Sequence, residues 1–235
     1  MEVFDCSKYF NKTDVFKSIS RDDLRSLHMT DAGRQGIFKP VTTDKGLSIK
    51  TALIALNGFA GDDYLQFFAE PNPMVRACLE HKSLIEKLPK VIDKYRAGVP
   101  ALAGGTFYFT NFVKVYPPKA EFNKAESMDT LLKNCPEITA LFRRYLREEI
   151  IGLIKDGCRV FICFGKSASD YFSDTFLIDV KAQCQVIGAV KSNSVRQCTI
   201  DNETVFVVSE RHYAYYANAT TGHLVHILAE HYNEK

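Results

Sequence analysis

The chain of 235 residues carries a formal net charge of +2, with 46% hydrophobic and 25% charged residues. This balance predicts one globular domain over residues 1–235 with a sizeable core, and the mild net charge by itself does not indicate a nucleic-acid binder, although a local basic patch is compatible with it. The seven cysteines are odd in number, scattered and never spaced as C-x-x-C, so reduced thiols are expected rather than a disulfide framework or a zinc site.

The first ten residues, "MEVFDCSKYF", lack the basic and apolar segments of a secretory signal. No apolar run approaches the roughly 20 residues that a membrane helix needs. The sequence therefore predicts a cytoplasmic protein with no membrane partner, and we expect a monomer.

An N-terminal extension over 1–50 is expected to begin with a helix at 15–28, followed by a loop rich in Gly, Lys and Thr. Beyond it, four short apolar segments bounded by turn or polar residues are typical of buried strands. They lie at 51–57, 106–115, 159–165 and 204–210. The segment 181–200 has a weaker pattern and is expected to add a short strand or a hairpin.

Helical patterns lie between these strands. Helices are predicted at 74–96, at 136–156 with Gly157 as its stop, and at 217–232 with Thr220 or Thr221 as its cap. Apolar strands that alternate with helices are typical of a parallel sheet covered on both faces. The expected fold class is α/β, a three-layer α/β/α domain with a central four-stranded parallel sheet in its core at 51–217.

Ligands of an open parallel sheet bind beyond the carboxyl ends of its strands, so the residues after each strand are the candidate site. The four exits are "NGFAGDDY" (57–64), Asn111 with "VKVYPP" (113–118), "GKSASD" (165–170) and "RHYAYY" (211–216). Each exit is polar, although the strand before it is apolar.

These exits resemble the motifs of the uracil-DNA glycosylase superfamily. The segment "TNFVKVYPP" (110–118) is similar to T-N-x-V-K-C-x-P-P of the family 4 enzymes, and "VFICFGKSA" (160–168) is similar to their V-I-V-A-L-G-K-T-A. The last exit lies where the superfamily carries H-P-S-[PY], and the first where it carries G-E-A-P-G or G-Q-D-P-Y. The order and spacing of the motifs match over about 51–217, which implies a divergent member with the fold of this superfamily.

Departures from the motifs limit what the resemblance implies. The family 4 enzymes bind an iron–sulfur cluster through the cysteine after the motif lysine, and Val115 stands there, so no cluster, other cofactor or metal is expected. Ala60 takes the place of the first-motif proline if "NGFAG" is aligned with G-E-A-P-G. The proline of the last motif is replaced by Tyr213.

The water-handling residue stays open between two alignments. In the first, the place where relatives keep that side chain falls on Gly58 or Phe59. In the second, "GDDY" is aligned with G-Q-D-P-Y and Asp63 becomes the matching carboxylate.

Cleavage of an N-glycosidic bond develops positive charge on the sugar and negative charge on the leaving base, so each needs a stabilising group. The catalytic candidates are Asp62 or Asp63 beside the sugar and His212 as donor to the base. A flipped base must be stacked and read, and the amide of Asn111 offers both a donor and an acceptor. The candidates for base binding are Asn57, Gly58, Phe59, Tyr64, Asn111 and Phe112. The candidates for DNA binding are Lys114, Lys166, Ser167, Arg211, Tyr213, Tyr215 and Tyr216.

Each candidate also has a structural interpretation. Asn111 suits the end of a strand, Asp62 and Asp63 suit the cap of a helix that begins at Tyr64, and the tyrosines suit packing. His223, His226 and His231 are interpreted as surface histidines of a helix, because their spacing fits no zinc motif.

The predicted function is a DNA glycosylase that flips a pyrimidine base, hydrolyses its N-glycosidic bond and leaves an abasic site. The small residues at 58, 60 and 61 favour a roomy pocket, so the expected base is uracil or a cytosine with a bulky carbon-5 modification, as in hypermodified phage DNA. A role in phage defence would follow from the latter. The alternatives are a non-catalytic DNA- or protein-binding member of the same fold and an N-glycosidase of nucleosides or nucleotides.

Overall fold

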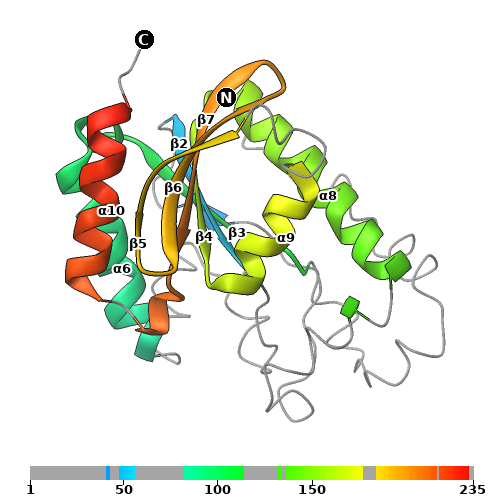
Figure 1. The fold of residues 1–235 in the computed structure, drawn as a ribbon, viewed down its shortest axis with the longest axis horizontal. Coiled ribbons are helices and arrows are strands. Elements are labelled where there is room, and N and C mark those ends of the chain that lie inside the picture. The colour runs from blue at the N-terminus through cyan, green and yellow to red at the C-terminus, as the bar shows by residue number, and fades with distance from the viewer. Residues whose placement is uncertain are drawn as a thin grey trace.

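The computed structural model describes residues 41–42, 48–56, 82–113, 132–133, 136–176, 184–215 and 217–232 (Figure 1). The predicted helix at 15–28 and the first residues of the predicted helix at 74–96 lie outside this part of the chain.

Seven strands of the described residues form one mixed sheet in the order β1-β3-β2-β4-β7-β6-β5. Strands β3, β2, β4 and β7 run parallel to one another, and β1, β6 and β5 pair antiparallel to their neighbours. The bounds are β1 (Val41–Thr42), β2 (Ile49–Ala55), β3 (Thr106–Asn111), β4 (Val160–Phe164), β5 (Cys184–Val190), β6 (Asn193–Ile200) and β7 (Glu203–Glu210). The α/β class is confirmed, but the sheet is mixed and larger than the predicted four-stranded parallel sheet.

The four parallel strands are the four strands that the sequence predicted. Every residue of β3 and of β4 is buried, as expected for strands whose two faces are both covered. The bounds of the other parallel strands differ by one or two residues from the prediction, and the largest difference is at β3, which ends at Asn111, whereas the prediction continued to 115. The apolar pattern therefore continues beyond the point where the sheet ladder stops.

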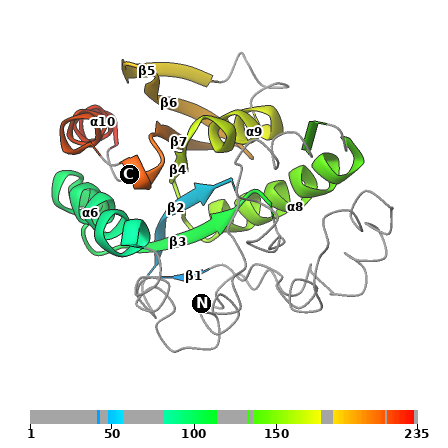
Figure 2. The same cartoon turned by 90° about the horizontal axis from the view of Figure 1, so that it is seen from below.

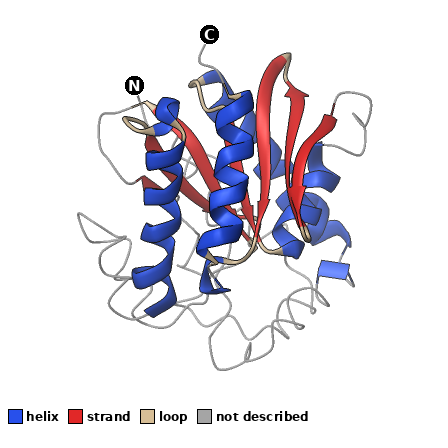
Figure 3. Ribbon diagram, turned by 60° about the vertical axis from the view of Figure 1, so that its left-hand side comes forward, coloured by secondary structure: helices blue, strands red, loops and turns tan. Residues whose placement is uncertain are grey.

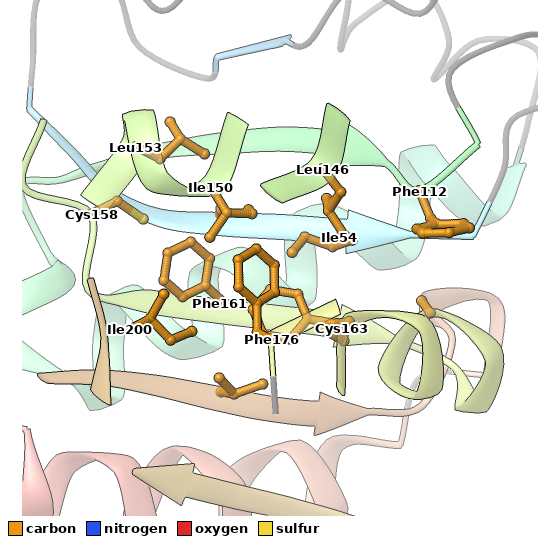
Figure 4. Packing of buried hydrophobic residues seen from close by; sticks show 14 of the residues in the cluster. Ile54, Phe112, Leu146, Ile150, Leu153, Cys158, Phe161, Cys163, Phe176 and Ile200 are labelled. Carbon is orange, nitrogen blue, oxygen red and sulfur yellow. The ribbon is translucent and has the colours of Figure 1, made fainter. Parts of the chain in front are cut away.

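Helices cover both faces of the sheet (Figures 2 and 3). Helices α8 (Pro136–Lys155) and α9 (Lys166–Phe176) lie on one face, and α6 (Lys82–Gly98) and α10 (Asn218–His231) lie on the other. Successive strand residues point to opposite faces, so Phe161 packs in the cluster under α8 and α9, and Ile162 packs in the cluster under α6 and α10. Figure 4 shows Phe161 facing Ile150 of α8 in the first cluster.

Helix α8 follows the predicted pattern closely. Leu146, Ile150 and Leu153 point into the core and are fully buried. The chain leaves the helix at Gly157, whose φ of +92° is the left-handed conformation that glycine adopts most readily. Within the described residues, no helix is long and apolar enough to cross a bilayer.

The predicted cap of α10 is wrong. Thr220 and Thr221 lie inside the helix with buried side chains, and the position before the first helical residue is Ala217. Two threonines next to each other match the composition of a cap, but here they pack on the apolar face of the helix.

The segment predicted as a strand or hairpin is the β5–β6 hairpin, which turns at Lys191 and Ser192. Cys184 and Cys198 face each other across the hairpin and form a disulfide. This corrects the expectation that all the cysteines are reduced thiols, because residues 14 apart in sequence are brought opposite by the antiparallel register. Cys158 and Cys163 are free and buried.

Candidate functional site

The carboxyl ends of the parallel strands bring three of the four predicted exits to one edge of the sheet. Asn111 lies opposite Ala55 at the end of β2. At the neighbouring end, the N–H of Gly165 donates to the carbonyl oxygen of Glu210 at 2.8 Å, which joins the turn after β4 to the turn after β7. The edge therefore presents, in order, the ends of β3, β2, β4 and β7.

The helices that follow β2 and β4 in the described chain lie on opposite faces of the sheet. The next described helix after β2 is α6, which covers one face, whereas β4 leads into α9 on the other face. A crevice outside the carboxyl ends at such a reversal is where open α/β sheets bind ligands. The topology thus favours a site around the ends of β2 and β4, with Asn111 on one side and His212 on the other.

Asn111 has an unusual environment for an amide. Its side chain is 1% exposed, and neither the amide nitrogen nor the amide oxygen has a hydrogen-bond partner within the described part of the chain. The backbone directly after it is hydrogen-bonded, since the N–H groups of Phe112 and Val113 donate to the carbonyl oxygens of Ala55 and Leu56 at 2.8 Å. Burial of an unpaired polar group costs about 1–3 kcal/mol, so this amide weakens the core that contains it.

Phe112 does not lie as predicted. Its ring is fully buried, stacks on Tyr171 of α9 at 4.4 Å between centroids, and meets Phe142 of α8 edge-on at 6.1 Å. A ring that is packed in the core in this way offers no free face to a base. The expectation that Phe112 stacks on a flipped base is therefore corrected: it is a core residue.

His212 follows β7 and is half-buried. Its ring lies 4.1 Å from that of Tyr213 between centroids, and burial lowers its pKa below the ordinary 6.5. At neutral pH the imidazole is therefore uncharged, with one N–H donor and one acceptor nitrogen. Gly165 lies next to it, since a Cβ built on this glycine would be in ordinary contact, 3.8 Å from the Cβ of His212. The reason why glycine suits this turn is its φ of +84°.

The tyrosines after His212 separate into two kinds. Tyr213 is buried and packs edge-on against Phe164 at 5.4 Å, so its predicted contact with DNA is corrected to a packing role. Tyr215 is 75% exposed in the 3₁₀ turn η4 (Tyr213–Tyr215). Tyr216 lies outside the described residues.

Two of the predicted phosphate contacts, Lys166 and Arg211, line the same pocket as His212. Lys166 and Ser167 begin α9, and Lys166 forms an i,i+4 ion pair with Asp170. Arg211 is exposed directly before His212. Lys114 lies outside the described residues.

One titratable group of this edge was missed. Glu210, the last residue of β7, is 4% exposed. Burial raises its pKa to about 7, although the hydrogen bond from the N–H of Arg211 acts in the opposite direction and lowers it. Tyr95 of α6 donates to its other oxygen at 3.2 Å. Glu210 stands at the polar end of an apolar strand, directly before Arg211 and His212, which is the sequence signal that singles it out.

The first-exit candidates are not described by the structure. Asn57, Gly58, Phe59, Asp62, Asp63 and Tyr64 all lie outside the described residues. The roles expected for them stay predictions. Within the described residues no group of three or more His, Cys, Asp and Glu side chains is arranged to hold a metal ion.

The helix histidines match their predicted position. His223 and His226 are exposed on α10, where His226 pairs with Glu230 at 3.2 Å, and Nδ1 of His231 lies 2.9 Å from the carbonyl oxygen of Ile227.

Comparison of the chain with protein-family models, curated proteins and solved structures finds no match.

Proposed function

We propose that this protein is a DNA glycosylase of the uracil-DNA glycosylase type. It flips a pyrimidine nucleotide, either uracil or a cytosine with a bulky carbon-5 group, into the edge formed by the carboxyl ends of β2, β3, β4 and β7. The observation that carries the proposal is the buried, unpaired amide of Asn111 on the same edge as the neutral imidazole of His212. β3 and β7 are three strand spacings apart, about 14 Å, a span suited to a base with its sugar and phosphates rather than to a small ion.

Asn111 is proposed to read the base. Its amide nitrogen donates and its oxygen accepts, which matches the mixed donors and acceptors on the Watson–Crick edge of a pyrimidine. Within the described part of the chain, this amide has no internal hydrogen bond to break when the base arrives. The free-energy cost of burying it is then recovered on binding.

His212 is proposed to stabilise the leaving base. When the N-glycosidic bond breaks, negative charge develops on the base, and an N–H donor aimed at a base oxygen stabilises it. The lowered pKa keeps the imidazole of His212 neutral at neutral pH. It therefore acts as a neutral hydrogen-bond donor and not as a charged acid.

The carboxylate beside the sugar is proposed to be Asp62 or Asp63. This part of the proposal depends on the motif resemblance alone. Glu210 does not replace it, because its oxygens already accept hydrogen bonds from the hydroxyl of Tyr95 and the N–H of Arg211.

The test uses end-labelled oligonucleotides with one uracil, hydroxymethylcytosine or glucosylated cytosine, followed by alkaline cleavage at abasic sites. Wild type is compared with His212→Ala and Asn111→Ala, and His223→Ala on the surface of α10 is the matched control. We expect strand breaks at one candidate base that fall at least 100-fold in the two site variants and stay at wild-type level in the control, since loss of one transition-state donor costs roughly 10²–10³ in rate.

Two outcomes would contradict the proposal. DNA binding with no break at any base would favour a non-catalytic binding protein. Base release from free nucleosides or nucleotides, but not from DNA, would favour a nucleoside or nucleotide N-glycosidase.

A further inference from the structure

A pocket of about 590 Å³ opens beside His212, on the face of the sheet that α9 covers. Its walls are α9, the β5–β6 turn, the adjoining ends of β6 and β7, and the turn after β7. This volume falls within the roughly 300–1,000 Å³ that small-molecule sites occupy. His212 and Arg211 line the pocket, so it adjoins the proposed active site.

Hydroxyl groups from three elements line the pocket. Ser194 of β6 and Ser209 of β7 are directly opposite each other in the antiparallel ladder, so their side chains lie on the same face about 5 Å apart. The serines of the lining are Ser169, Ser173, Ser192, Ser194 and Ser209. We call this cavity, with Arg196, the serine–arginine pocket.

Arg196 links the two walls of the serine–arginine pocket. It stands two residues after Ser194 on β6, and its guanidinium donates to the hydroxyl of Ser173 on α9 at 3.2 Å. Its Nε is buried and has no hydrogen-bond partner within the described residues. No carboxylate of the described chain pairs with Arg196, so its charge is not neutralised by an ion pair.

The negative charges around the serine–arginine pocket are already engaged. Asp170 is paired with Lys166. The carboxylate of Glu210 accepts the hydrogen bond of Tyr95, a residue of the cluster on the opposite face of the sheet. The lining holds three basic groups, Lys166, Arg196 and Arg211, against the two acidic groups Asp170 and Glu210, so it keeps a net positive charge beside its hydroxyl donors.

We propose that the serine–arginine pocket binds a phosphate group, and that in the proposed glycosylase reaction this phosphate belongs to the DNA strand next to the flipped nucleotide. A phosphate presents acceptor oxygens in all directions, and a guanidinium with surrounding hydroxyls supplies matching donors. The second part of the proposal depends on the proposed function. The first part also holds for the phosphate of a free nucleotide.

The pocket would position the strand rather than select the base. Phosphate contacts fix register and orientation on DNA and carry no sequence information. With a phosphate held at Arg196, the adjoining nucleotide is held close to His212, which lines the same cavity.

The experiment measures the binding of three probes: a labelled single-stranded oligonucleotide, deoxycytidine 5′-monophosphate and inorganic phosphate. The variants are Arg196→Gln and the double variant Ser194→Ala/Ser209→Ala, which removes two hydroxyls without touching the buried guanidinium. Lys155→Gln is the control, because Lys155 is an exposed cation in the last turn of α8, at the opposite end of the sheet.

We expect Arg196→Gln to raise the Kd for the oligonucleotide about tenfold, which corresponds to about 1.4 kcal/mol, because it removes a charged hydrogen-bond donor to the phosphate. The slope of log K against log salt should fall by about 0.7, the value for one phosphate contact on a single strand. The serine double variant should raise Kd severalfold at an unchanged slope, because it removes no charge, and Lys155→Gln should leave both quantities at wild-type values.

The outcomes separate this proposal from the glycosylase. Wild-type affinity and salt slope in both pocket variants would overturn the phosphate site even if base release is observed. Failure of the wild type to bind any of the three probes would also overturn it. Arg196-dependent binding of the mononucleotide or of phosphate, with no oligonucleotide binding and no base release, would support the phosphate site with a free nucleotide as ligand and overturn the glycosylase.

Discussion

The hydroxyl of Tyr95 donates a hydrogen bond of 3.2 Å to the carboxylate of Glu210, which ties α6 to the last residue of β7. The N–H of Arg211 donates to the other carboxylate oxygen at 3.1 Å. Glu210 directly precedes the turn that carries His212, so these two hydrogen bonds fix where that turn begins. Burial raises the pKa of Glu210 to about 7, and burial also raises the pKa of the Tyr95 hydroxyl.

This raised pKa predicts a pH-dependent stability. The folded protein holds the Glu210 proton more tightly than the unfolded chain does, so the stabilisation is complete below about pH 4.5, falls as pH rises and is lost above about pH 7. The loss amounts to about 3 kcal/mol at 1.36 kcal/mol per pKa unit. Urea unfolding of wild type and Glu210→Gln at pH 5 and pH 8 measures it, and the free energy of unfolding of the variant should fall less over this range. Glu203→Gln, at the exposed start of β7, is the control, and a parallel pH dependence in wild type and Glu210→Gln would contradict the prediction.

Asn111 should contribute to function at the expense of stability. Because its buried amide has no hydrogen-bond partner in the described structure, Asn111→Leu replaces an unsatisfied polar group by an apolar group of similar size. We expect the free energy of unfolding to rise by about 1 kcal/mol while base release is lost. Denaturant titration combined with the oligonucleotide assay gives both quantities. A loss of more than about 2 kcal/mol would instead mean that the amide stabilises the fold.

The activity should persist at acidic pH until His212 becomes charged. Because burial lowers the pKa of His212 below 6.5, the neutral donor form predominates down to a lower pH than for an exposed histidine. Single-turnover rates measured from pH 4.5 to 8 should fall on the acid side with a midpoint below 6.5. In His212→Gln, which keeps a neutral donor, the residual rate should lack this acid limb. An acid limb that is identical in the variant would assign it to another group.

The two described tyrosines of η4 should respond differently to truncation. Tyr213→Ala removes a buried ring that packs on Phe164, and it should lower the free energy of unfolding by about 3 kcal/mol. Tyr215→Ala should leave stability within about 0.5 kcal/mol, because its ring is 75% exposed, and should weaken DNA binding severalfold. Thermal unfolding measures the change in stability, and fluorescence anisotropy measures the change in DNA affinity. If both variants lost DNA affinity equally and neither lost stability, the distinction would be contradicted.

The parallel strands could be predicted because burial on both faces leaves a continuous apolar run in the sequence. The hairpin at 184–200 has a weak sequence pattern, since no residue of β5 is fully buried and the strand alternates only in part. The disulfide could not be predicted, because it depends on the register that places Cys184 opposite Cys198.

The positions of some candidate residues at strand ends could be predicted, whereas their surroundings could not. Asn111 ends β3, and His212 comes two residues after the end of β7, as the apolar runs of the sequence indicated. Phe112 and Tyr213 were wrong because their burial is decided by Tyr171 and Phe164, contacts that no local sequence pattern reveals. Glu210 was missed because a glutamate at a strand end is ordinarily solvated, and its burial depends on tertiary contacts such as the one with Tyr95 of α6.

The most direct measurement of the central claim is the release of a free base from DNA. Wild type, Asn111→Leu and His223→Ala are incubated with oligonucleotides that carry one candidate pyrimidine, and the products are identified by mass spectrometry. We predict a free pyrimidine base and an equal amount of abasic strand for wild type and for His223→Ala, and neither product for Asn111→Leu. Intact strands from the wild type with every candidate pyrimidine, or release at the same rate from Asn111→Leu, would contradict the claim.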